Sequence, residues 1–219
     1  NGSEYSIMAG PEERVITLPE NETFSRVAMQ YATAGFEHIL EGYDHLLFVF
    51  CLVLVVSQFR RTLNALTGFT HGHSITLVMP PLAQWSLPPT FVEPLIAFSV
   101  LILATEKMSG KKETLTGRYP TLIATCFGLL HGFGFGGALA ELGLPQTLQL
   151  QALAFFNIGV ELGQALFVLV LFAVFAVIKP LITIRPSMPS MTTLGRVAVY
   201  PAGIMSGYWT IERVLGIWL

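Results

Sequence analysis

Apolar residues run along most of this chain in long stretches, which Pro, Gly and charged residues separate. A membrane span needs about 20 mainly apolar residues to cross roughly 30 Å of hydrocarbon, and the pattern predicts six such segments. They cover residues 36–57, 62–82, 89–107, 119–140, 150–178 and 194–219. We therefore expect an all-α fold, a polytopic helix bundle that lies within a lipid bilayer.

Composition supports this interpretation and excludes several function classes. Of the 219 residues, 53% are hydrophobic and only 12% are charged, whereas soluble domains carry about 25% charged residues. The net charge of −2 gives no basic footprint for nucleic acid. Cys51 and Cys126 both lie inside apolar runs, so neither a disulfide framework nor a cysteine metal site is expected.

The basic residues predict the orientation of the chain. Segments 80–88 and 141–149 contain no Lys or Arg, whereas the alternate connections are rich in both. Because basic loops face the cytoplasm, we expect an integral protein of a bacterial-type inner or plasma membrane, with both termini extracytoplasmic. The basic residues concerned are Arg60, Arg61, Lys107, Lys111, Lys112, Arg118, Lys179, Arg185 and Arg196.

Residues 1–30 differ from the rest in carrying several Glu and little apolar content. We expect them to form an extracytoplasmic lead-in, a remnant of a larger N-terminal region, before a transmembrane domain over residues 31–219. They lack the basic start and apolar centre of a signal peptide.

Polar and ionisable side chains inside the spans are the candidate chemistry, since such groups are costly in hydrocarbon. At 1.5 Å per residue, those of the first, second, fourth and fifth spans fall at one depth in the outer half of the membrane. A shared depth argues against scattered structural histidines. The residues concerned are all five histidines, His38, His45, His71, His73 and His131, together with Asp44, Asn157 and Glu161.

Helical spacing refines this cluster. His38 and His45 share a face, as do Asn157, Glu161 and Gln164, whereas His71 and His73 cannot both point the same way. We expect a centre formed by one set of residues: His45, Asp44, His131 and Glu161, joined by either His71 or His73. His38 is placed at the entrance, and Asn157, Gln164 and Ser74 are expected in support.

Imidazoles and carboxylates gathered in a dry setting are the ligands of a divalent first-row metal, with Zn²⁺ and Ni²⁺ favoured. Mg²⁺ and Ca²⁺ prefer oxygen ligands alone. The alternatives are a proton relay through histidine and carboxylate, and purely structural hydrogen bonding.

Four ordered motifs carry a family resemblance over about residues 36–215. The segment from His38 to Asp44 and His45 resembles the histidine, five residues, Asp-His motif of the HupE/UreJ membrane proteins. Segments 69–77, 127–135 and 156–164 resemble the second branch of that family. The resemblance implies a nickel permease or an accessory protein of hydrogenase or urease. The paired histidines of the permease branch's second motif are represented here by His131-Gly alone.

Three functions remain open from the sequence. The first is a divalent metal permease or accessory transporter, with nickel or cobalt as cargo. The second is an intramembrane zinc hydrolase acting on a lipid or a membrane-anchored peptide, with Asp44 or Glu161 as the general base. The third is a structural membrane subunit. The expected partners are the lipid bilayer and the metal ion, and both a homo-oligomer and a further membrane partner stay open.

Overall fold

Helices make up the whole regular structure of the described residues. The computed structural model describes residues 23–79, 87–111, 113–141, 148–184 and 189–218. Within them lie eight helices and no strand, so the predicted all-α class is confirmed. The helices are α1 (Phe24–Glu41), α2 (Tyr43–Val56), α3 (Phe59–Leu77), α4 (Pro89–Ser109), α5 (Leu115–Arg118), α6 (Pro120–Glu141), α7 (Gln149–Ile184) and α8 (Met191–Leu215).

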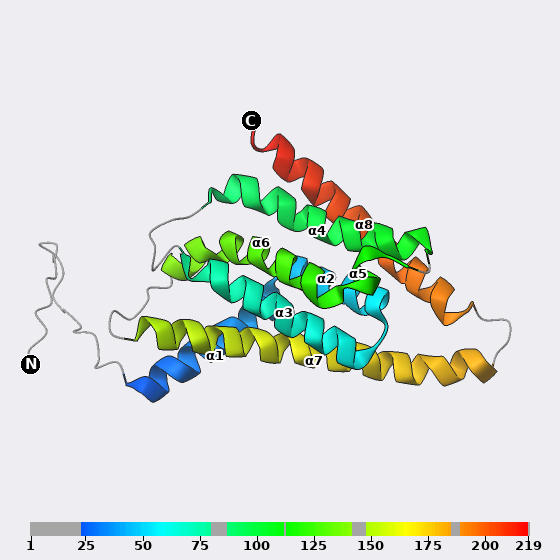
Figure 1. The fold of residues 1–219 in the computed structure, drawn as a ribbon, viewed down its shortest axis with the longest axis horizontal. Helices are drawn as coiled ribbons and strands as arrows, with labels where there is room; N and C mark the ends of the chain where they lie inside the picture. The colour runs from blue at the N-terminus through cyan, green and yellow to red at the C-terminus, as the bar shows by residue number, and fades with distance from the viewer. Residues whose placement is uncertain (1–22, 80–86, 112, 142–147, 185–188, 219) are drawn as a thin grey trace, which may run out of the picture.

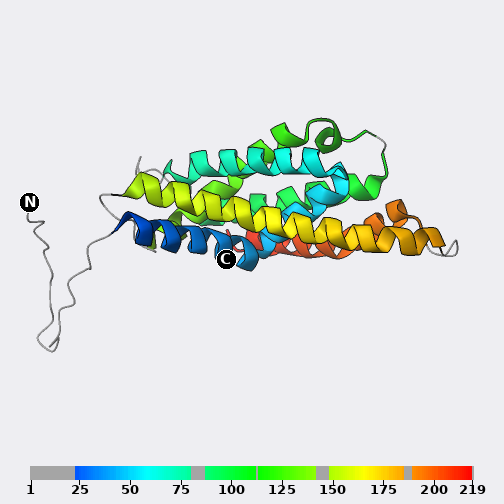
Figure 2. The same ribbon diagram turned by 90° about the horizontal axis from the view of Figure 1, so that it is seen from below.

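The long helices lie side by side along one axis, and the chain runs back and forth between the two ends of the bundle (Figures 1 and 2). Each predicted span after the first corresponds to one long helix. The basic connections between α2 and α3, between α4 and α6, and between α7 and α8 all lie at the same end (Figure 1). Lys112, Arg185 and most of the expected lead-in lie outside the described residues.

The first predicted span, residues 36–57, is not one continuous helix. Two helices, α1 and α2, meet there at a bend of 71°, and α1 begins at Phe24, so the expected boundary at residue 30 falls inside a helix. The backbone turns at Gly42, where ψ is 86° and therefore outside the helical region. A Cβ at Gly42 would lie 2.8 Å from the His38 carbonyl oxygen and 2.9 Å from His45 Nδ1. Glycine thus lets the chain turn with His38 and His45 directly beside the turn.

Three helix pairs form the most extensive contacts of the bundle: α3 with α6, α1 with α7, and α4 with α8. Glycines in the first two pairs let the backbones touch. A Cβ at Gly128 of α6 would overlap the Phe69 carbonyl of α3, and one at Gly159 of α7 would overlap the Ala32 carbonyl of α1. Small residues serve this purpose in membrane helices, where packing has no hydrophobic driving force.

Hydropathy alone supports fewer spans than the sequence prediction. In the described residues, Gln149–Pro180 of α7 is long and apolar enough to cross a membrane, and α1 with α2 qualify together as one bent pair. Only 17% of the apolar α7 window is buried, so its apolar side chains face outward. The other helices of the described residues do not pass this test, although Pro120–Gly134 of α6 is apolar over a shorter length, and the count of six spans stays a prediction.

An apolar core closes the bundle on the side of the basic connections. It is built around α2 and includes Phe48, Leu52, Phe69, Val100 and Leu103, all of them almost completely buried. A second, smaller apolar cluster joins α1 to α7 near the opposite end and includes Tyr31, Ile39 and Phe156. The histidines lie between these two clusters.

Candidate metal centre

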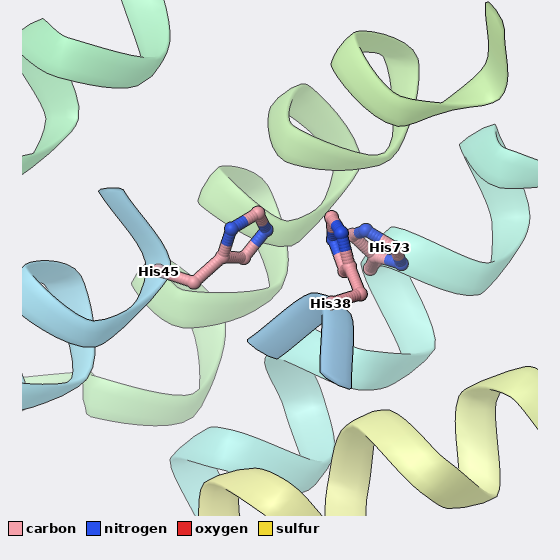
Figure 3. A group of neighbouring side chains, drawn as sticks. All are labelled: His38, His45 and His73. Atoms are coloured by element: carbon pink, nitrogen blue, oxygen red, sulfur yellow. The ribbon is translucent and has the colours of Figure 1, made fainter. Parts of the chain in front are cut away.

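Three histidines from three helices come together where α1 and α2 meet α3. His38, His45 and His73 each offer a ring nitrogen, and these three nitrogens lie within 4.8 Å of one another (Figure 3). The ring centroids of His38 and His45 are 4.8 Å apart, and those of His45 and His73 are 6.0 Å apart. We call these residues the histidine trio.

The break at Gly42 explains how the first two members meet. His38 lies in the last turn of α1 and His45 in the first turn of α2, so the bend brings two rings together that a straight helix would hold about 10 Å apart along its axis. His73 comes from the last two turns of α3 and is completely buried. Aromatic rings pack around the trio, with Phe156 beside His38 and Phe69 stacked on His73.

His131 of α6 is a fourth imidazole at the edge of the trio. It is completely buried, and its ring centroid lies 5.0 Å from that of His45. The Ser99 hydroxyl donates its hydrogen to the Ile96 carbonyl, 2.7 Å away, and so must accept from His131 Nε2, 3.1 Å away. Nε2 therefore carries the proton of a neutral His131, and Nδ1 keeps the lone pair that a metal would need.

Asp44, which we placed in the centre of the site, forms an ion pair instead. Its Oδ2 lies 3.0 Å from Arg213 Nη2 of α8. The same guanidinium donates to the Glu93 carbonyl of α4 at 3.1 Å. Asp44 follows the α2 N-terminus, one residue before His45, and at 100° per residue its side chain points away from the trio toward α8.

Glu161 and His71 also lie apart from the trio, on the exposed side of α3 and α7. The Thr67 hydroxyl donates to Glu161 Oε1 at 2.8 Å. His71 Nδ1 lies 2.6 Å from the Thr67 carbonyl, and must be its donor, because a carbonyl only accepts. Of the two histidines in question on α3, the structure thus brings His73 to the cluster.

The comparisons with known proteins place this geometry in a family. A family model described as HupE / UreJ protein matches residues 13–213. The chain belongs to the HupE/UreJ family. HupE/UreJ proteins are membrane proteins associated with nickel and cobalt uptake, so the membrane location and the family predicted from the motifs are confirmed. Searches of the curated proteins and of the solved structures found no significant match.

The expected supporting residues take different positions in this HupE/UreJ protein. Asn157 of α7 donates to the Leu153 carbonyl at 2.9 Å and so bonds the backbone of its own helix. Gln164, completely buried, accepts a hydrogen bond of 3.3 Å from Thr70, one turn of α3 below His73. Ser74 donates to the Thr70 carbonyl and thus supports α3 rather than the trio.

Two residues of this HupE/UreJ site were missed as functional candidates. Ser99 fixes the His131 tautomer and Arg213 neutralises Asp44. Arg213 had a signal in the sequence, since an unpaired charge within a predicted span needs a partner. Ser99 had none, because a lone serine in an apolar helix usually bonds its own backbone.

The donor set of the trio fits a first-row divalent metal in chemistry and nearly in size. Neutral imidazoles suit Zn²⁺, Ni²⁺ and Co²⁺. Nitrogens bound at about 2.0–2.1 Å in a tetrahedral shell lie about 3.4 Å apart, so separations within 4.8 Å require the rings to close by no more than about 1.4 Å.

Proposed function

We propose that this HupE/UreJ protein binds a divalent transition metal, Ni²⁺ or Co²⁺, at the histidine trio and carries it across the membrane as cargo. The observation that carries this proposal is the meeting of three imidazole nitrogens from three helices within 4.8 Å. Imidazoles accept these metals in their neutral form, so the site costs little when no ion is bound. Three nitrogen ligands without a bound carboxylate also suit a cargo that must be released.

The apolar core on the side of the basic connections supports an alternating-access mechanism. Phe48 lies directly below the site, with its ring centroid 5.3 Å from that of His131, and is completely buried together with Leu52 and Phe69. Release toward that side requires this layer to open, and α2, which carries both His45 and Phe48, is the element that couples the two. Helices broken at the binding site, as α1 and α2 are at Gly42, are common in transporters.

Hydrolysis is the weaker candidate because its two proposed general bases lie elsewhere. Asp44 is paired with Arg213, and Glu161 lies on the exposed side of the bundle. A metal-dependent hydrolase needs a base within reach of the metal-bound water. In the described residues neither carboxylate belongs to the trio.

Transport is tested by metal uptake into proteoliposomes with a Ni²⁺-sensitive dye inside. We expect uptake by the wild-type protein, its loss in His45→Ala, and its retention in His71→Ala, which changes an exposed histidine of α3. Metal binding without uptake in any orientation would favour a structural subunit. Release of product from lipid or peptide substrates that stops in His45→Ala would favour the hydrolase.

A further inference from the structure

An open cavity lies about 18 Å along α3 from His73, at the end of the bundle that carries the basic connections. Its volume is about 380 Å³. The first turns of α3 and α6 and the short helix α5 form its walls, which we call the basic groove. It is lined by Arg61, Asn64, Arg118, Tyr119, Thr121 and Leu122, with Pro120.

The charge of the basic groove is one-sided. Two guanidiniums, Arg61 and Arg118, line it, and its lining includes no Asp or Glu. Glu106, a carboxylate of α4 near α5, accepts from the Thr116 backbone at 3.3 Å and does not line the groove. An anion in this groove would therefore meet two positive charges and no negative one.

Arg61 is held in place for such an anion. Its Nη2 donates to the Gly117 carbonyl at 2.8 Å and more weakly to the Arg118 carbonyl at 3.4 Å. These bonds fix the plane of the guanidinium and leave, among the described residues, the hydrogens of Nε and Nη1 for a ligand. A preorganised fork of this kind matches phosphate oxygens, because less side-chain freedom is lost on binding.

The opposite rim combines charge with apolar surface. The Arg118 guanidinium lies over the Tyr119 ring, 5.2 Å from its centroid. Below them Leu122 is 61% exposed on the outer face of α6, and Leu115 of α5 is equally exposed. Tyrosine prefers the boundary between headgroups and hydrocarbon, with leucine on the hydrocarbon side. The guanidinium, the tyrosine ring and the leucine surface thus follow each other in the same order as the charged headgroup, the interfacial region and the acyl chains of a phospholipid.

We propose that the basic groove binds one anionic phospholipid. Its phosphate lies between Arg61 and Arg118, its headgroup hydroxyls reach Asn64, and an acyl chain extends along Leu122. Basic pockets between membrane helices on the cytoplasmic side recognise lipids of this class. The bound lipid joins α3 to α5 and α6 at their cytoplasmic ends and so stabilises the helix pair that carries His73 and His131.

The test is lipid binding to the purified full chain in a non-ionic detergent. The protein is titrated with phosphatidylglycerol, with phosphatidylcholine of the same acyl chains, and with inorganic phosphate. Native mass spectrometry counts retained lipids, and thermal unfolding reports stabilisation. We expect one retained phosphatidylglycerol and a higher Tm, little retention of phosphatidylcholine, and no competition by phosphate, since phosphate cannot use Leu122.

Variants separate the groove from general surface charge. Arg118→Gln should weaken phosphatidylglycerol binding about fivefold, and Arg61→Gln with Arg118→Gln more strongly, since one basic residue near an anionic headgroup contributes about 1 kcal/mol. The matched control, Lys111→Gln with Lys179→Gln, removes two exposed charges at the same end of the bundle but outside the groove and should bind like wild type.

Arg61→Gln also removes the hydrogen bonds of Arg61 to the Gly117 and Arg118 carbonyls. The variant Asn64→Trp tests the groove while leaving these bonds in place. The indole fills the groove without changing its charge and should abolish retention of the lipid. Equal binding of both lipids, displacement by phosphate, or equal affinity in Arg118→Gln and the control would each overturn the proposal.

Discussion

Replacing His73 by Phe should abolish tight metal binding while preserving the fold. His73 is completely buried and stacked on Phe69, with ring centroids 6.0 Å apart. A phenyl ring can keep that contact and most of the volume, but it has no ligand nitrogen. The trio then loses one of its three donors and retains two imidazoles.

The size of the loss follows from the geometry. The three nitrogens must close by up to about 1.4 Å around a metal, and two imidazoles alone cannot complete three sides of a coordination shell. Removing a partner outside the first shell already costs 10–100-fold in affinity, so removing a ligand should cost at least about 100-fold, or about 2.7 kcal/mol.

The assay is competition between the purified protein and a chromophoric chelator for Ni²⁺, Co²⁺ and Zn²⁺. His71→Phe is the matched control, because His71 lies two residues away on the same helix but is exposed and donates to the Thr67 carbonyl. Thermal unfolding without metal checks that both variants fold. Equal affinities of the two variants would refute the assignment of His73 to the site.

Three further predictions concern pH, packing and topology. Metal affinity should fall by more than tenfold per pH unit once the pH drops below the apparent pKa values of the ligands, because protons compete with the metal for the imidazole lone pairs; an affinity that stays constant down to the lowest pH at which the protein remains folded would exclude histidine ligands. Gly128→Ala should lower the free energy of unfolding by about 1–3 kcal/mol, and with it the Tm, because the new Cβ overlaps the Phe69 carbonyl. Gly207→Ala is the control, since its Cβ would lie 3.9 Å from Leu101, and it should leave the Tm unchanged. In a Cys126→Ser background, Lys111→Cys and Leu150→Cys should react with impermeant thiol reagents from opposite sides of the membrane; labelling of both from one side would contradict the predicted topology.

The helix bounds could be predicted well where Pro, Gly and charge interrupt the apolar pattern. Pro89 begins both the predicted third span and α4. The start of α1 at Phe24 could not be predicted, because this helix is only modestly apolar and is held by close packing on α7 through positions such as Gly35 and Gly159. Hydropathy measures transfer into lipid, and it is blind to helix pairs that bury small residues against each other.

The sequence could predict the level of the candidate residues along the helix axes, but not the side of each helix on which their side chains lie. Counting residues from the span ends placed the histidines at one level, and the structure brings His38, His45 and His73 together there. The same counting placed Asp44 and Glu161 at that level, yet one faces Arg213 and the other the exterior. The rotation of each helix about its axis depends on which helices pack against it, and a single sequence does not reveal those neighbours.

The pairing of helices also has a consequence for biosynthesis. In each of these pairs the first helix is synthesised well before its partner: α3 before α6, α1 before α7, and α4 before α8. The trio residues are all made early, but Phe156, whose ring packs beside His38, is made only with α7. The ribosome must therefore deliver more than two thirds of the chain before His38 is held beside His73. A nascent protein that stops short of α7 would expose imidazoles in the membrane without holding them in place, so the completed site is a product of late assembly.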